Sequence, residues 1–233
     1  ALGDFPDTTA AEAIRRLSGI TVENDQGEGR YVSIRGLSGD LNAIAVNGAM
    51  VPAPEGGRKV MLDGIPTELL DSIEVYKSLT ADKDADSIGG RIEFKTKKAR
   101  SLNGTLFKIK LDSSYNDQSK NSNNPKLAMT YGDMITDNLG HILGVTYASK
   151  QIISYNNETG FPGWTDTENG KRLDDDWEMR YYDLTRERTG ITYDLDYVIN
   201  DETSIFANLL YNHYEDDELR NKDEYGSLKH GDV

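Results

Sequence analysis

The chain has 233 residues and a formal net charge of −14, with 36% apolar residues, 28% charged residues and no cysteine. The lack of cysteine excludes disulfide scaffolds, cysteine-ligated zinc and thiol catalysis, and no apolar run reaches the ~18 residues that a membrane-spanning helix needs. With 40 acidic against 26 basic residues, nucleic acid is not expected as a partner. A membrane protein built of strands remains compatible with the mean hydropathy of −0.63, because alternating strands keep this average low.

The composition changes near residue 100. The first hundred residues carry 13 Lys and Arg, 16 Asp and Glu and two Tyr, whereas the other 133 carry 13, 24 and 11. We therefore expect two domains, 1–100 and 101–233, with the boundary at residues 97–103. Since the chain begins at Ala1 without Met or a signal peptide, we interpret it as a processed or trimmed product.

The first half predicts a small α+β globule. Asp7 or Thr9 can cap a helix that ends at Gly19, with Ala10, Ala13, Ile14 and Leu17 on one face. Short strands are expected at 20–23, 31–35, 43–47, 73–76 and 91–96. Between them, Pro66 suits the first turn of a second helix that runs through Leu69, Leu70 and Ile73.

The second half alternates with period two. Apolar residues alternate with polar or small ones around residues 107–111, 127–131, 143–147, 191–199 and 204–214. The expected connections are long at 116–124, short at 136–138, long at 155–178 and short at 200–202. This rhythm is typical of an outer-membrane barrel, and it makes the strand from Thr105 run outward from the periplasm. A soluble sandwich, whose apolar face meets a second sheet, fits the periodicity equally well.

Two lysines of the first barrel strand indicate which of its faces can be buried in lipid. A lysine that faces lipid at mid-bilayer costs roughly 2–4 kcal/mol. We therefore expect Lys108 and Lys110 to face the interior in either architecture.

Several segments of the first half resemble the plug domain of TonB-dependent outer-membrane transporters. They are Phe5-Pro6-Asp7, Ala11-Glu12-Ala13, 17–22, Gly27-Glu28-Gly29-Arg30, 32–37, Val46-Asn47-Gly48, 54–57, Ile65-Pro66, 72–75 with Lys77, and 84–90. Some of these are similar to one branch of the family, several of whose members import oligosaccharides. The second half resembles the barrel by pattern only.

The resemblance implies an α+β plug globule followed by antiparallel transmembrane β-barrel strands, about five of the roughly 22 in a plugged transporter. It implies a location in the Gram-negative outer membrane, contact with lipid, no enzymatic activity and no cofactor. It also implies TonB-dependent import, in which TonB pulls a segment expected upstream of Ala1, while the remaining strands are expected to follow residue 233. An oligosaccharide is the expected ligand. A ferric siderophore is the alternative, and a soluble carbohydrate-binding or adhesive module without transport is another.

Candidate site residues follow from the outward direction of the plug strands. The links after these strands predict ligand contacts at two plug apices, and an aromatic outer loop adds a residue that can stack on a sugar. These residues are Ser38, Asp40 and Asn42 at one apex, Pro52, Pro54, Glu55 and Arg58 at the other, and Trp164 on the loop. Each also fits a solvated turn or, for Trp164, a structural role.

Arg35 and Lys77 are candidates for anchoring the plug to the barrel. A guanidinium can hold a carboxylate with two hydrogen bonds, although Arg35 can equally close a surface hairpin. Lys77 stands where the family often has an Arg-Gly pair, and an ammonium cannot reproduce the guanidinium fork.

A calcium-loop pattern begins at Asp82. Asp82, Asp84, Asp86 and Glu93 fall at positions 1, 3, 5 and 12 of the template, but Ser87 replaces the required glycine and a strand replaces the exiting helix. We interpret these residues as a turn before a strand. The three histidines lack zinc-site spacing, so no metal is expected.

Overall fold

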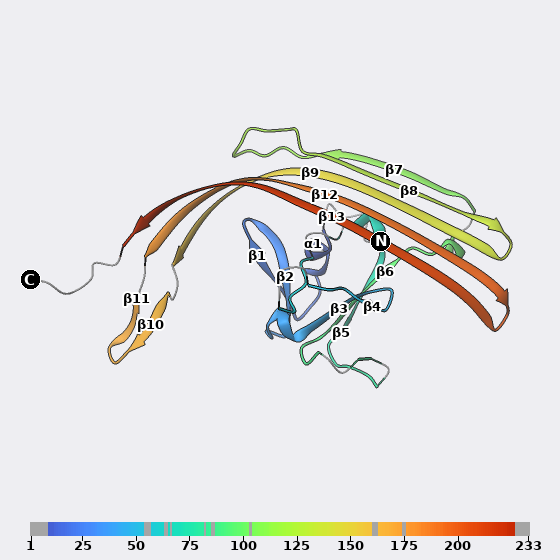
Figure 1. Cartoon of the computed structure of the whole chain (residues 1–233), viewed down its shortest axis with the longest axis horizontal. Coiled ribbons are helices and arrows are strands. Elements are labelled where there is room, and N and C mark those ends of the chain that lie inside the picture. Colours follow the sequence, from blue (N-terminus) through green and yellow to red (C-terminus); the bar gives the residue numbers. More distant parts are fainter. Residues whose placement is uncertain are drawn as a thin grey trace, which may run out of the picture.

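The computed structural model describes residues 9–53, 57–62, 65, 67–81, 83–84, 87–102, 104–159, 163–173 and 176–226. Figure 1 shows two parts: a long, curved sheet made by the second half of the chain, and a small domain from the first half under its concave face. We call the curved sheet the wall.

The N-terminal domain contains one short helix, a hairpin and a mixed sheet. Its elements are α1 (Ala10–Ile14), β1 (Ile20–Asp25), β2 (Glu28–Ile34), β3 (Asn42–Val46), β4 (Ala49–Met50), β5 (Leu70–Tyr76) and β6 (Gly90–Thr96), with 3₁₀ turns η2 (Gly39–Leu41), η3 (Thr67–Leu69) and η4 (Ala99–Ser101). β1 pairs with β2, and the sheet has the order β4-β3-β6-β5, in which β3 and β6 are parallel. Fully buried Ile14, Ile34, Leu62, Ile92 and Phe94 form the centre of an apolar core.

The helices differ from the sequence-based expectation. The Thr9 side chain caps α1 by accepting a hydrogen bond from the Glu12 amide, as expected, but α1 ends at Ile14 instead of Gly19. The expected second helix is wrong: only the 3₁₀ turn η3 forms, and strand β5 follows. Ile73 and Val75 are β-branched residues in register with β6, and this pairing outweighs the helical spacing. Asp7 and Pro66 lie outside the described residues.

The wall is a five-stranded antiparallel sheet in the order β13-β12-β9-β8-β7. Its strands are β7 (Leu106–Ser113), β8 (Pro125–Thr136), β9 (Leu139–Thr159), β12 (Trp177–Asn200) and β13 (Thr203–Tyr225). The four expected connections alternate between long and short as the sequence indicated, and the long segment before β12 contains an additional hairpin, β10 (Trp164–Thr167) with β11 (Gly170–Leu173). The strands β9, β12 and β13 are longer than the alternating runs alone indicated.

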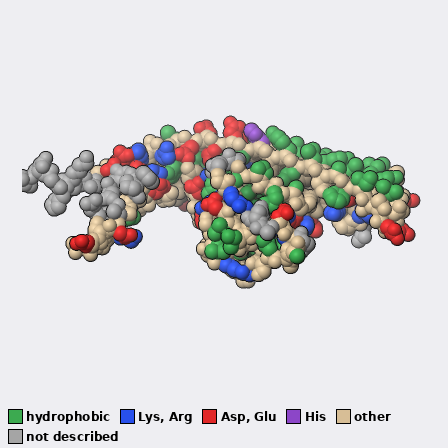
Figure 2. All heavy atoms as spheres, turned by 60° about the horizontal axis from the view of Figure 1, so that its bottom comes forward, with side chains coloured by type: hydrophobic (Ala, Val, Ile, Leu, Met, Phe, Trp, Pro, Cys, Tyr) green, Lys and Arg blue, Asp and Glu red, His purple; other side chains and the backbone are tan. Residues whose placement is uncertain are grey.

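The two faces of the wall have opposite polarity. Phe107, Ile109 and Leu111 of β7 are 64%, 52% and 74% exposed on the outward face, whereas Lys110 forms an ion pair with Glu68 of the N-terminal domain. Apolar side chains follow the wall in Figure 2. A soluble sandwich would bury its apolar face, but here the N-terminal domain covers the polar face. Among the described residues, no helix is long and apolar enough to cross a membrane.

The outward apolar band has a limited height. On β9 it runs from Leu139 to Tyr147 and includes His141, whose ring contacts Tyr131 and Tyr193; Ser149 and Gln151 follow on the same face. Eight residue steps correspond to roughly 27 Å of strand, comparable to the ~25 Å apolar band of outer-membrane barrels. The wall strands continue beyond this band toward β10 and β11 (Figure 1).

Candidate functional site

Glu28, the first residue of β2, is the centre of a buried ion cluster between the N-terminal domain and the wall. Its carboxylate accepts hydrogen bonds from Lys150 of β9 at 2.8 Å and from Arg186 and Arg188 of β12 at 3.1 and 2.6 Å. The Glu28 side chain is 5% exposed and that of Arg186 is fully buried. We call these four residues the Glu28 cluster.

The tip of the β1–β2 hairpin brings Glu28 to the wall. Gln26 and Gly27 have positive φ values of 49° and 87°, which tightens the turn. A Cβ atom at Gly27 would lie 3.3 Å from the Ile152 side chain, so glycine permits this close approach. Gln26 accepts a hydrogen bond from Arg186, which also pairs with Asp216 of β13 at 3.2 Å.

The charge of Glu28 is strongly stabilised. Burial alone would raise its pKa, but Arg188 and Lys150 outweigh this effect and lower the pKa from 4.5 to about 2. Glu28 therefore remains ionised at neutral pH, and removal of one cation would leave buried charge uncompensated.

A second cluster surrounds Glu68 of η3. The Glu68 carboxylate lies 2.6 Å from the Lys126 ammonium and 3.6 Å from the Lys110 ammonium. The Lys97 ammonium donates a hydrogen bond to the Glu68 backbone carbonyl at 3.3 Å. Burial and the nearby Lys108 lower the pKa of Lys97. Lys108 and Lys110 therefore face the interior, as the sequence predicted.

Glycines of the wall allow the N-terminal domain to approach closely. A Cβ atom at Gly144 of β9 would lie 2.7 Å from Cδ2 of Leu69 and 2.6 Å from the Thr192 hydroxyl. At Gly140 it would lie 2.6 Å from Cβ of Ala99. These two glycines are therefore contact positions between the two parts.

The structure brings together three of the residues proposed as apex contacts. The Asp40 carboxylate accepts a hydrogen bond from the Arg58 amide at 3.1 Å, and the Ser38 hydroxyl lies 3.4 Å from the same carboxylate. The two links therefore form one polar surface, which we call the apex group.

Three of the other proposed ligand residues, Asn42, Pro52 and Trp164, lie in the described part of the chain. Asn42 is buried and donates to the Val32 carbonyl at 2.8 Å. Pro52 is exposed, whereas Pro54 and Glu55 lie outside the described residues. Trp164 is 52% exposed on the β10–β11 hairpin, opposite Leu173, and this hairpin stands away from the N-terminal domain in Figure 1.

The residues proposed as anchors contact the N-terminal domain itself. Arg35 donates to the Ser78 hydroxyl at 3.2 Å, and Lys77 donates to Ser18 at 3.3 Å. Their anchoring role stays a prediction. Glu28 and Glu68, which the sequence reasoning missed as anchors, form ion pairs with the described wall. Glu28 lies in the glycine-flanked segment that carried the family resemblance, and Arg186 and Arg188 occupy alternate positions of one strand face.

The residues of the calcium-loop pattern have other partners or are not described. Glu93 forms hydrogen bonds with Arg91 at 2.9 Å, and Asp84 lies 3.9 Å from Arg91. Asp82 and Asp86 lie outside the described residues. No group of three or more metal-ligating side chains occurs in the part of the chain that the structure describes.

These features define an outer-membrane plug-and-barrel architecture: an N-terminal domain held by buried ion pairs against the polar face of a wall whose other face is apolar. Residues 1–91 match the family model described as TonB-dependent Receptor Plug Domain, and the wall corresponds to part of a TonB-dependent receptor barrel. TonB-dependent receptors reside in the Gram-negative outer membrane, so the expected location is confirmed. The family is one of transporters and not of enzymes, also as expected.

Solved structures with the same fold include two receptors and one transporter. The chain is similar to the ferric enterobactin receptor PfeA of Pseudomonas aeruginosa in its G324V mutant form, with a TM-score of 0.55 and 14% identity over 91% of this chain and 39% of that one. It is also similar to the siderophore receptor PirA of the same organism, with a TM-score of 0.51 and 15% identity over 94% of this chain and 40% of that one. The ferric citrate transporter FecA is similar with a TM-score of 0.51 and 13% identity over 96% of this chain and 48% of that one.

The chain thus spans less than half the length of these structures. No curated protein matches the sequence.

Proposed function

We propose that the protein of which this chain is part imports a ligand across the outer membrane in a TonB-dependent manner. The observation that carries this proposal is the Glu28 cluster, because it holds the plug against the polar inner face of a wall with an apolar outer face. A plug in this position blocks the pore, so transport requires its displacement or rearrangement. TonB, which the plug family implies as the partner, would supply that work.

A ferric chelate of the siderophore type is the ligand class that we now favour. The similar structures are named as a ferric enterobactin receptor, a siderophore receptor and a ferric citrate transporter, which supports our alternative ligand better than the oligosaccharide we expected. The apex group supports ligand contact at Ser38, Asp40 and Arg58, since it presents polar groups from two links.

An uptake assay tests the function and the ligand class together. A strain that lacks the gene is compared with one that carries it, in backgrounds with and without TonB, using ⁵⁵Fe-labelled chelates and labelled oligosaccharides. We expect gene- and TonB-dependent accumulation of a chelate. Chelate uptake that does not change when the gene is deleted would overturn the chelate proposal, and ligand uptake that persists without TonB would overturn the mechanism.

An oligosaccharide is the second candidate, and Trp164 is the observation that favours it. Its ring is half-exposed on an outer hairpin, where it can stack on a sugar face. If the ligand is an oligosaccharide, Trp164→Ala should weaken sugar uptake several-fold while Trp177→Ala, at the start of β12, should not. Equal effects of the two substitutions would argue against a ligand role for Trp164.

A further inference from the structure

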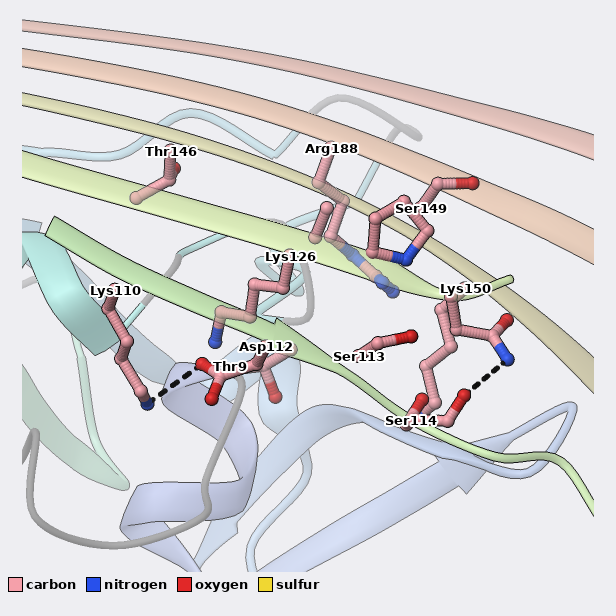
Figure 3. Close-up of a pocket in the computed structure, with 13 residues that line it drawn as sticks. Thr9, Lys110, Asp112, Ser113, Ser114, Lys126, Thr146, Ser149, Lys150 and Arg188 are labelled. Atoms are coloured by element: carbon pink, nitrogen blue, oxygen red, sulfur yellow. Dashed lines mark hydrogen bonds and ion pairs between the residues drawn. The ribbon is translucent and has the colours of Figure 1, made fainter. Parts of the chain in front are cut away.

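A cavity of about 280 Å³ lies beside the Glu28 cluster, between the wall and the start of α1. Figure 3 shows Lys110 of β7 and Lys126 of β8 reaching from the wall toward this space, with Asp112 beside Lys110. Thr9 is the lining residue from the N-terminal domain; the other lining residues are Lys110, Asp112, Ser113, Ser114, Asn124, Pro125, Lys126, Thr146, Ala148, Ser149, Lys150 and Arg188.

The lining has an excess of positive charge. It contains four cationic side chains, Lys110, Lys126, Lys150 and Arg188, and one carboxylate, Asp112. This excess is local, because the whole chain carries a net charge of −14. An opposite charge in the cavity would therefore be attracted by its walls.

Asp112 lies 3.3 Å from Lys110, but the carboxylates that pair with Lys126 and Lys150 do not line the cavity. Glu68 lies 2.6 Å from Lys126 and Glu28 lies 2.8 Å from Lys150, and both belong to the N-terminal domain. An ammonium group has three N–H donors, so one such contact leaves donors for a second acceptor. The lysines can therefore keep their ion pairs and still bind an anion.

The hydroxyl groups complete the chemistry of the site. Thr9, Ser114 and Thr146 add hydroxyl groups to the lining, and hydroxyls donate to oxyanion oxygens as readily as they do to water. The described lining contains no aromatic side chain, so it offers no stacking surface.

We infer that this cavity is a binding site for a small oxyanion, a carboxylate or a phosphate, held by Lys110, Lys126 and Lys150. The site is distinct from the apex group, and it does not depend on the proposed import function. Its occupant lies against the wall strands β7–β9, which carry these three lysines.

Calorimetric titration of the full-length protein, purified in detergent, tests the site directly. Inorganic phosphate and succinate are titrated separately at constant ionic strength set by sodium chloride. We expect saturable binding of at least one of them, and the tighter of the two identifies the oxyanion class. If neither anion binds the wild-type protein, the inference is overturned, whatever the uptake assay shows.

Two variants localise the binding. Lys126→Gln removes a cation and should weaken binding at least ten-fold, since hydrogen bonds to charged groups are the strong ones. Lys126→Gln also breaks the ion pair with Glu68. Ala148→Leu removes no charged group and instead fills the cavity, so it tests the need for the cavity separately from the ion pair. It should weaken binding to a similar degree.

Lys120→Gln is the matched control. Lys120 lies outside the cavity in the loop between β7 and β8, pairs with Asp117 and is 68% exposed. It should bind the anion like the wild type. Wild-type affinity in both Lys126→Gln and Ala148→Leu would overturn the site, as would an equal loss in Lys120→Gln, because that pattern indicates nonspecific charge attraction.

Discussion

The plug and the wall use the same apolar residues in opposite ways. In the plug, Phe94 and Ile92 of β6 are fully buried in an apolar core, and the buried charges Arg91 and Glu93 of the same strand pair with each other. In the wall, Phe107 and Ile109 of β7 face outward, and Lys110 faces inward. The comparison teaches that alternation fixes which residues share a face, whereas the surroundings of the sheet decide which face is buried.

The boundary between the two regions also buries charge. Glu28 and Glu68 come from the plug, and most of their partners come from the wall. Buried ion pairs stabilise little relative to apolar contacts, but a broken pair is costly. The interface is therefore specific in register and sensitive to the loss of a single partner.

Loss of Arg186 should have the largest effect on this interface. Arg186→Leu removes one of the three cations that pair with Glu28 and takes away the Arg186 partner of Asp216, so we expect the plug–wall attachment to weaken by about 3–5 kcal/mol. Protease accessibility of the plug in the purified full-length protein measures the loss. Arg220→Leu, at a half-exposed position of β13, is the control and should be close to neutral. Equal protection in wild type and Arg186→Leu would contradict the central role of the cluster.

Acid should release the same contact over a defined range. The pKa of Glu28 in the folded protein is about 2, below its ordinary value of 4.5. The stabilisation that ionised Glu28 gives to the plug–wall contact is therefore complete above pH 4.5 and is lost as the pH falls toward 2. A shift of this size corresponds to about 3 kcal/mol at neutral pH.

The acid effect is measured as plug protection against pepsin between pH 5 and 2. Glu28→Gln should remove the part of the pH dependence that Glu28 supplies, since an amide does not titrate in this range. An unchanged acid profile in Glu28→Gln would show that other groups control the release.

A lysine on the outward face distinguishes lipid from water. Leu209 and Leu219 of β13 are both 60% exposed, but Leu209 lies opposite Tyr193 within the apolar band, and Leu219 lies opposite Asp183 beyond it. We expect Leu209→Lys to destabilise the folded barrel by about 2–4 kcal/mol and Leu219→Lys to leave it nearly unchanged. Urea unfolding in lipid vesicles measures both. A similar cost at the two positions would contradict the assigned band.

Much of this fold was predictable, because the strands obey local rules. The alternation around residues 191–199 and the Thr9 cap are visible in the residues themselves and were confirmed. The helix expected after Pro66 was wrong because the pairing of Ile73 and Val75 with β6 depends on residues about twenty positions away. Pairing of this kind leaves no local signal.

The site was less predictable than the fold. Links such as 38–42 are visible as polar turns, and Asp40 does contact the Arg58 amide. The partners of Glu28 lie more than 120 positions away in the chain, and only the packed structure joins them. A charged residue on the inward face of a strand signals that it has a partner, but not which one.

Wall glycines give the smallest effect, and they test whether the plug fits closely against the wall. Gly144→Ala places a methyl group 2.7 Å from Leu69 of the plug and 2.6 Å from Thr192, so one of these neighbours must move. Overpacking of this kind costs about 1–3 kcal/mol. Plug protection against protease should decrease while the wall strands remain folded, as circular dichroism would show. Leu69→Ala in the same chain removes the contacted side chain and should relieve the part of the cost that arises at the plug. If Leu69→Ala gives no relief, the strain lies within the wall, between β9 and β12, and the plug does not press on Gly144.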